Sequence, residues 1–158
     1  MNSTINELNK EKFVGTWKLV LYELNVSGGE VNYPFGLDAV GWLVYDINGH
    51  MFVQVMCLDR ATFASGDRLR GTLEETKSAF EGYLAYFGTY EVNEEQRTVT
   101  HHIEGSLFPN WVGTAQKRFF EFTDDQLTLK SPPILVDGKQ QTGRIIWKRV
   151  AWSIYNKR

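Results

Sequence analysis

The feature that most constrains this chain is a series of eight strand-like runs, separated mainly by turn residues. Within the runs apolar and polar residues tend to alternate, which is typical of half-buried strands. A sheet of strands that follow one another in this way is expected to close on itself, because a closed barrel leaves no edge strand with unpaired backbone groups. The sequence therefore predicts an all-β fold, an eight-stranded antiparallel up-and-down β-barrel. The runs are Val14–Leu24, Val40–Ile47, His50–Leu58, Phe87–Asn93, Arg97–Gly105, Ala115–Thr123, Gln126–Ser131 and Thr142–Trp152.

Residues between the runs favour tight antiparallel hairpins. Asn48 and Gly49 give the strongest hairpin signal, because both tolerate a positive φ. Asp124 and Asp125 fit a two-residue turn, and Asn93–Gln96 fits a turn of four residues. These short connections indicate that consecutive strands pair with one another.

Two segments depart from the strand pattern and predict helices. Ser3 or Thr4 can cap a short helix near the N-terminus. Thr72 and Glu75 have the spacing of a capping box, and apolar residues then recur at helical spacing. This pattern predicts an internal helix over about Leu73–Ala85. Its apolar stripe is expected to be buried across an end or a flank of the barrel.

Composition and charge exclude several classes of protein. The net charge is -2 and basic residues are scattered, so the chain lacks the cationic surface that nucleic acids require. A single cysteine, Cys57, permits no internal disulfide and fits a reducing compartment. No apolar run has the length of a transmembrane segment, and Met1–Lys12 does not resemble a signal peptide. We therefore expect a single domain over residues 1–158 that is cytoplasmic and does not insert into membranes; a homodimer is compatible with the sequence.

Aromatic residues are frequent, at 14% of the chain. Such side chains are favoured both in strands and in ligand pockets. Eight strands enclose a volume that side chains can fill or can leave open for one small ligand. Composition alone leaves a filled core and a pocket as open alternatives.

Two short motifs resemble the lipocalin and wider calycin signature. The first predicted strand contains Gly15–Trp17 (GTW), and the last contains Trp147–Arg149 (WKR). In that signature a basic residue of the last strand covers the tryptophan of the first. The resemblance implies that Arg149 lies over Trp17, a cation–π contact of about 0.5–2 kcal/mol. We expect Gly15, Trp17 and Arg149 to close one end of the barrel.

Longer segments are similar to bacterial lipocalin-like domain proteins. They are Phe63–Asp67 (FASGD), Phe80–Tyr90 (FEGYLAYFGTY) and Thr100–Trp111 (THHIEGSLFPNW). The similarity extends over about 14–150, nearly the whole chain. It implies the barrel. Because most members of this family have no assigned function, it implies little about chemistry.

His101 and His102 are the most evident candidates for chemistry. Adjacent strand residues point to opposite faces, and the expected hairpin places His101 inside the barrel and His102 outside. His101 then admits three roles: a buried neutral imidazole bonded to protein groups, a contact to a ligand or substrate, or a ligand of a metal or haem. A zinc site needs three or four convergent ligands, which three histidines and one cysteine do not supply. We predict no metal and no cofactor.

The remaining candidates form a mixed wall, mostly apolar with a few polar groups, as small-molecule sites commonly have. Tyr45 and Gln54 are placed as cross-strand neighbours around the turn at 48–49. The loop Ser106–Gly113 either packs over the end of the barrel or forms a lid. The predicted ligand-binding residues are Tyr45, Gln54, Tyr90, His101, Asn110, Trp111, Phe120, Phe122 and Trp147.

The sequence therefore predicts binding of a small, mostly hydrophobic molecule inside the barrel, oriented by His101, Gln54 and a tyrosine hydroxyl. The alternative is a cofactor-independent isomerase, cyclase or hydratase that acts on an apolar metabolite, with His101 as general acid or base. Catalysis requires His101 to face an open spot together with a tyrosine or a carboxylate. A His101 held on both nitrogens by protein groups would not serve as the base. No nucleophile elbow or pair of catalytic carboxylates is visible.

Overall fold

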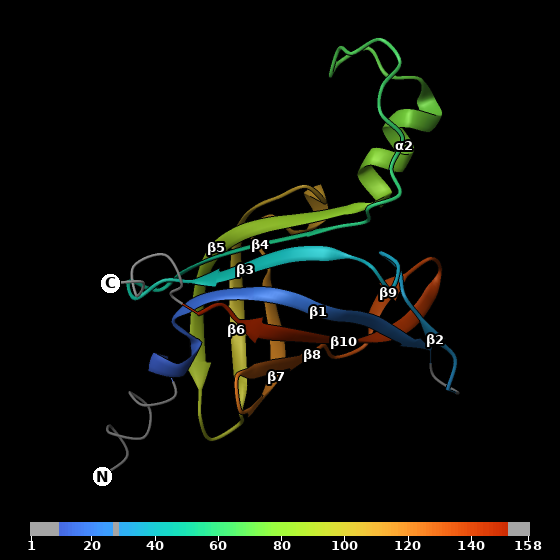
Figure 1. Cartoon of the computed structure of the whole chain (residues 1–158). Helices are drawn as coiled ribbons and strands as arrows, with labels where there is room; N and C mark the ends of the chain where they lie inside the picture. Colours follow the sequence, from blue (N-terminus) through green and yellow to red (C-terminus); the bar gives the residue numbers. More distant parts are fainter. Residues whose placement is uncertain (1–9, 27–28, 152–158) are drawn as a thin grey trace.

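The computed structural model describes residues 10–26 and 29–151, and its helices and strands are shown in Figure 1. The helix expected around Ser3 and Thr4 lies outside the described residues; residues 10–13 are helical. One further helix and a 3₁₀ turn accompany the strands, α2 (Leu73–Glu81) and η1 (Pro109–Trp111). The strands are β1 (Gly15–Val26), β2 (Val31–Asn32), β3 (Val40–Tyr45), β4 (His50–Met56), β5 (Tyr83–Asn93), β6 (Thr98–Ser106), β7 (Ala115–Thr123), β8 (Gln126–Lys130), β9 (Ile134–Val136) and β10 (Lys139–Arg149).

Eight of these strands form a closed antiparallel barrel. Hydrogen-bonded neighbours follow the order β1-β3-β4-β5-β6-β7-β8-β10, and β10 pairs again with β1. This confirms the fold predicted from the run of strands and turns. The short strands β2 and β9 were not predicted; they pair with β1 and β10 at one end of the barrel (Figure 1). Asp137 and Gly138, both at positive φ, make the tight turn between β9 and β10.

The opposite end of the barrel is closed by aromatic rings. Trp17 is buried, and its indole nitrogen donates to the Phe13 carbonyl at 2.9 Å. The Arg149 guanidinium lies over the indole, 4.2 Å from the ring centroid. Gly15 has a φ of 138°, and a Cβ there would lie 2.8 Å from the Arg149 guanidinium. A glycine at position 15 therefore leaves room for the arginine that covers Trp17.

A bulge in β1 changes which residues face inward. The register against β10 shifts between Leu19 and Leu21, so the inward side passes from Trp17 and Leu19 to Tyr22 and Leu24. Unbroken alternation from Trp17 would place Leu21 on the inward face, but the bulge places Tyr22 there instead. A bulge of one residue inverts the alternation that follows it.

The internal helix is shorter than expected and is not buried. The capping box of Thr72 and Glu75 is present, but α2 ends at Glu81 and Gly82 caps it. The next residues pair with β4 as the start of β5, so the strand overrides the helical pattern. No residue of α2 is buried, and Leu73 is 90% exposed. The expectation that its stripe packs on the barrel is therefore wrong.

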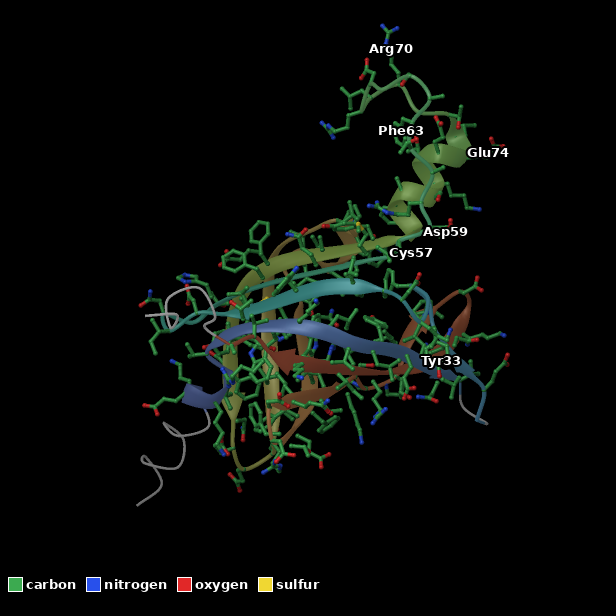
Figure 2. The ribbon with its side chains drawn as sticks, viewed as in Figure 1. Tyr33, Cys57, Asp59, Phe63, Arg70 and Glu74 are labelled. Carbon is green, nitrogen blue, oxygen red and sulfur yellow. The ribbon has the colours of Figure 1, made fainter. Side chains whose placement is uncertain are left out.

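Helix α2 and the loop before it project from the barrel. Figure 2 shows the chain leaving the sheet at Cys57, with Phe63 and Glu74 along the projection and Arg70 at its far end. Glu75 ties the loop to the helix by accepting hydrogen bonds from the backbone of Ala64 and Thr72. Within residues 10–26 and 29–151, no helix has the length and apolar character needed to cross a membrane.

Candidate functional site

Three buried side chains form a polar group inside the barrel. His101 comes from β6, Tyr45 from β3 and Tyr86 from β5. The Tyr45 hydroxyl lies 2.6 Å from His101 Nε2, and the Tyr86 hydroxyl lies 2.9 Å from His101 Nδ1. A neutral imidazole has one donor and one acceptor, so one hydroxyl donates to the ring and the other accepts from it. Both ring nitrogens of His101 are thus engaged by protein groups.

Burial keeps this polar group uncharged. Enclosure, reinforced by the charges of Arg118 and His102, lowers the pKa of His101 to about 3. Burial also raises the pKa of Tyr45 well above its ordinary value and raises that of Tyr86. A general base needs a pKa near the working pH and an available nitrogen. The geometry therefore favours a hydrogen-bonded core histidine over the base that the catalytic alternative requires.

A buried cation lies beside this group. Arg118 on β7 is 6% exposed, and its Nη1 donates to the Lys117 carbonyl at 2.9 Å. Its positive charge acts on the titration of Tyr22, Tyr86 and His101, which places the guanidinium near the polar group. In the part of the chain that the structure describes, no carboxylate forms an ion pair with Arg118. A buried charge without a counter-ion is costly, so Arg118 is a candidate for a functional role.

A small cavity of about 20 Å³ lies in the barrel between these side chains. Its wall includes His101, Tyr86, Arg118 and Trp147. Trp147 is 1% exposed, and its indole N–H meets no acceptor among the described residues. The space fits one water or one group of similar size. The deep interior is therefore almost filled, except for a hole that an indole donor and a guanidinium border.

A much larger pocket, of about 650 Å³, opens at the end of the barrel where β2 and β9 lie. Its wall is mainly apolar and comes from the loop after β2, the start of β5, the loop after β6, and β9. Tyr33 marks this end in Figure 2. The walls of the large pocket and of the small cavity share Tyr22, Leu84 and Trp111. We call the large pocket the mouth pocket and the small cavity the floor cavity.

Several sequence-predicted residues face inward but belong to the packed core. Tyr45, Tyr90 and Phe120 are buried, and the Tyr90 hydroxyl donates to the Asp46 carbonyl at 2.8 Å. Phe120 and Phe122 pack against Phe13 at the closed end, with ring centroids 4.9 Å from it in both cases. These four residues line neither the mouth pocket nor the floor cavity. Aromatic side chains thus fill the part of the lumen in which we expected the ligand.

Two predicted residues lie outside the lumen. The register pairs Tyr45 with Met51 and Trp42 with Gln54, so Gln54 points outward, where it bonds the Tyr83 hydroxyl. Placing Gln54 inside the barrel was wrong, because the turn sets a register one residue different from the expected one. Asn110 is exposed in η1 and lines neither space. Trp111, half-buried beside it, lines both.

The structure brings in residues that sequence reasoning missed. Tyr22 turns inward only because of the bulge in β1, which no sequence signal revealed. Tyr86 fell between the predicted helix, which ended at about Ala85, and the predicted strand from Phe87, so its direction was not considered; the structure places it in β5. Arg118 had a usable signal, since it alternates with Phe120 and Phe122 on the inward side of β7. A charged residue in register with core aromatics indicates a functional position.

The described residues contain no group of three or more His, Cys, Asp or Glu side chains that could hold a metal ion. Polar atoms at the floor come instead from hydroxyl, imidazole, indole and guanidinium groups. This set of groups suits an organic ligand with an acceptor group.

Comparison with known proteins gives two similarities. A family model described as a lipocalin-like domain matches residues 14–150. The 4'-hydroxy-3'-methoxypropiophenone carrier protein ppsC of Aspergillus oryzae is 33% identical over 107 residues, which make up 63% of this chain and 96% of that protein. The match therefore covers nearly the whole of the fungal carrier.

Proposed function

Since the chain belongs to the lipocalin-like domain family, whose barrel binds small molecules, we propose that it carries a small, mostly hydrophobic molecule in its mouth pocket. The observation that carries the proposal is the mouth pocket itself. Its volume, about 650 Å³, lies within the range of about 300–1,000 Å³ of small-molecule sites. A ligand lying there would reach the floor cavity between Tyr22, Leu84 and Trp111.

Two further observations support a carrier. The relative from Aspergillus oryzae is named for carrying an aromatic ketone, a molecule of the size and polarity that such a pocket accepts. The imidazole of His101 is engaged on both nitrogens, so it is not available as the base that the catalytic alternative assigns to it. We place the carrier in the cytoplasm, in keeping with its single cysteine. A homodimer stays a prediction.

The mouth pocket can be tested with a variant that fills it. Replacing Leu84 by tryptophan adds bulk where the mouth pocket meets the floor cavity. We expect calorimetric titration to show saturable binding of 4'-hydroxy-3'-methoxypropiophenone or of 2-naphthamide by the wild type, weakened at least about tenfold in Leu84→Trp. A displaced ligand loses about 1.4 kcal/mol or more of contact energy, which corresponds to that factor.

Leu69→Trp is the matched control, because it adds the same bulk to an exposed loop residue that borders neither space. It should bind both probes as the wild type does. Thermal unfolding of both variants separates lost binding from lost folding. Equal binding of a probe by the wild type and by folded Leu84→Trp would contradict the proposal.

A further inference from the structure

The floor of the barrel holds a positive charge, on Arg118, that no carboxylate of the described residues neutralises. Arg118 has no carboxylate partner in the described ranges, although its side chain is almost fully buried. The titratable groups on which its charge acts are Tyr22, Tyr45, Tyr86 and His101. None of these groups is negative at neutral pH, since burial raises the pKa of each tyrosine and lowers that of the histidine. The described residues around Arg118 therefore supply no negative charge to balance it.

A second, independent observation lies in the same wall. The Trp147 indole N–H borders the floor cavity, is buried, and has no acceptor among the described side chains and carbonyls. Buried donors without an acceptor are rare in folded proteins, because each costs roughly 1–3 kcal/mol. Guanidinium and indole are both donors only. Two donor-only side chains thus border the floor cavity, and the Trp147 indole is the one that meets no acceptor among the described residues.

The size of the floor cavity limits what that acceptor can be. About 20 Å³ takes one oxygen-sized group, while the apolar mouth pocket takes the rest of a ligand. An anionic oxygen would neutralise Arg118 and accept from Trp147 at once. Charge-assisted hydrogen bonds of this kind are roughly twice as strong as neutral ones.

Resting on the proposed carrier function, we propose that the floor cavity is an anion subsite, in which Arg118 and Trp147 bind the anionic oxygen of a hydrophobic carboxylate or phenolate. The ligand class is therefore an apolar, amphipathic organic anion whose charged end enters first. Tyr86 and His101 complete the floor and hold the arginine among neutral groups.

The test compares ligands of one shape that differ in charge. Calorimetry at mildly alkaline pH, where both acids are ionised, measures 2-naphthoate against 2-naphthamide, and 4-nitrophenolate against 4-nitroanisole. The wild type should bind at least one anion about tenfold or more tightly than its neutral partner. The pair that shows the larger preference identifies carboxylate or phenolate as the natural head group. Arg118→Met should abolish the preference, and Arg118→Lys should keep part of it.

Matched variants make the outcome decisive. Lys117→Met removes the same charge from the neighbouring exposed position and should keep the preference. Trp147→Phe should weaken binding of the anion several-fold while the amide is affected less. Thermal unfolding without ligand should show Arg118→Met to be as stable as the wild type or a few degrees more stable, because an unpaired buried charge is removed.

The two proposals fail in different ways. Equal binding of each anion and its neutral partner by the wild type overturns the anion subsite and leaves the carrier function standing. An anion preference that persists in folded Arg118→Met also overturns it. Binding of none of the four probes overturns the carrier function itself.

Discussion

Replacing Trp17 by alanine is expected to lower the free energy of unfolding by about 3–5 kcal/mol, the usual cost of removing a fully buried tryptophan. The indole is 1% exposed at the closed end of the barrel. Its removal leaves the Phe13 carbonyl without its donor and Arg149 without the ring that it covers. Unfolding in urea, followed by far-ultraviolet circular dichroism, measures the loss.

Trp42→Ala is the matched control. Trp42 lies on the neighbouring strand β3, paired with Lys18, and its side chain is half-exposed on the outer face. We expect this variant to lose about 1 kcal/mol at most. Because folded domains have only about 5–15 kcal/mol of stability, Trp17→Phe serves as a milder second variant with an intermediate loss. Equal losses in Trp17→Ala and Trp42→Ala would contradict the packing role assigned to Trp17.

The strand order of the barrel could be predicted because it depends on local signals. Most of the eight runs show alternation and are joined to the next run by turn residues. The prediction for β7 agrees with the structure at both ends, Ala115 and Thr123. When consecutive strands pair, the first and last strands are left as edges, and closing the barrel pairs their free backbone groups with each other. The short strands β2 and β9 were not predicted, because strands of two or three residues are too short to show an alternating pattern. Asp137 and Gly138 were the usable signal for the β9–β10 hairpin.

Side-chain direction could be predicted only where the register is regular. Alternation counted from a correct hairpin places His101 inside, as the structure has it. It fails after the bulge in β1, which turns Tyr22 inward, and at the β3–β4 turn, which puts Gln54 outside. In both cases a shift of one residue exchanges the two faces of the strand. Such shifts depend on contacts between strands that a single sequence does not reveal.

The position of the pocket could not be predicted from the sequence, for a different reason. An excess of aromatic residues is equally compatible with a filled core and a lined cavity, and this barrel has both. Phe13, Phe120 and Phe122 fill the closed end, whereas Tyr22 and Trp111 border open space. Whether a given part of the barrel interior is filled or open depends on the summed volumes of the side chains that meet there in three dimensions.

Acidification should destabilise the protein through His101. The folded-state pKa of His101 is lowered to about 3 by burial, whereas an unfolded chain has the ordinary value of 6.5. A lowered histidine pKa means that the unfolded chain takes up the proton first, so the stability present above pH 6.5 is lost as the pH falls toward about 3. Between about pH 7 and about pH 5 the expected loss from this residue alone is about 2 kcal/mol.

His101→Gln separates this contribution from those of the other titrating groups. Glutamine retains a donor and an acceptor for the hydroxyls of Tyr45 and Tyr86 but takes up no proton. The variant should be less stable than the wild type at neutral pH, because its amide fits the two hydroxyls less well, and the difference should shrink by about 2 kcal/mol by about pH 5. His102→Gln, on the outer face, is the matched control for the same substitution in urea unfolding. Parallel stability curves for the wild type and His101→Gln would show that His101 titrates inside the folded barrel, and the neutral, hydrogen-bonded histidine beside Arg118 would then have to be abandoned.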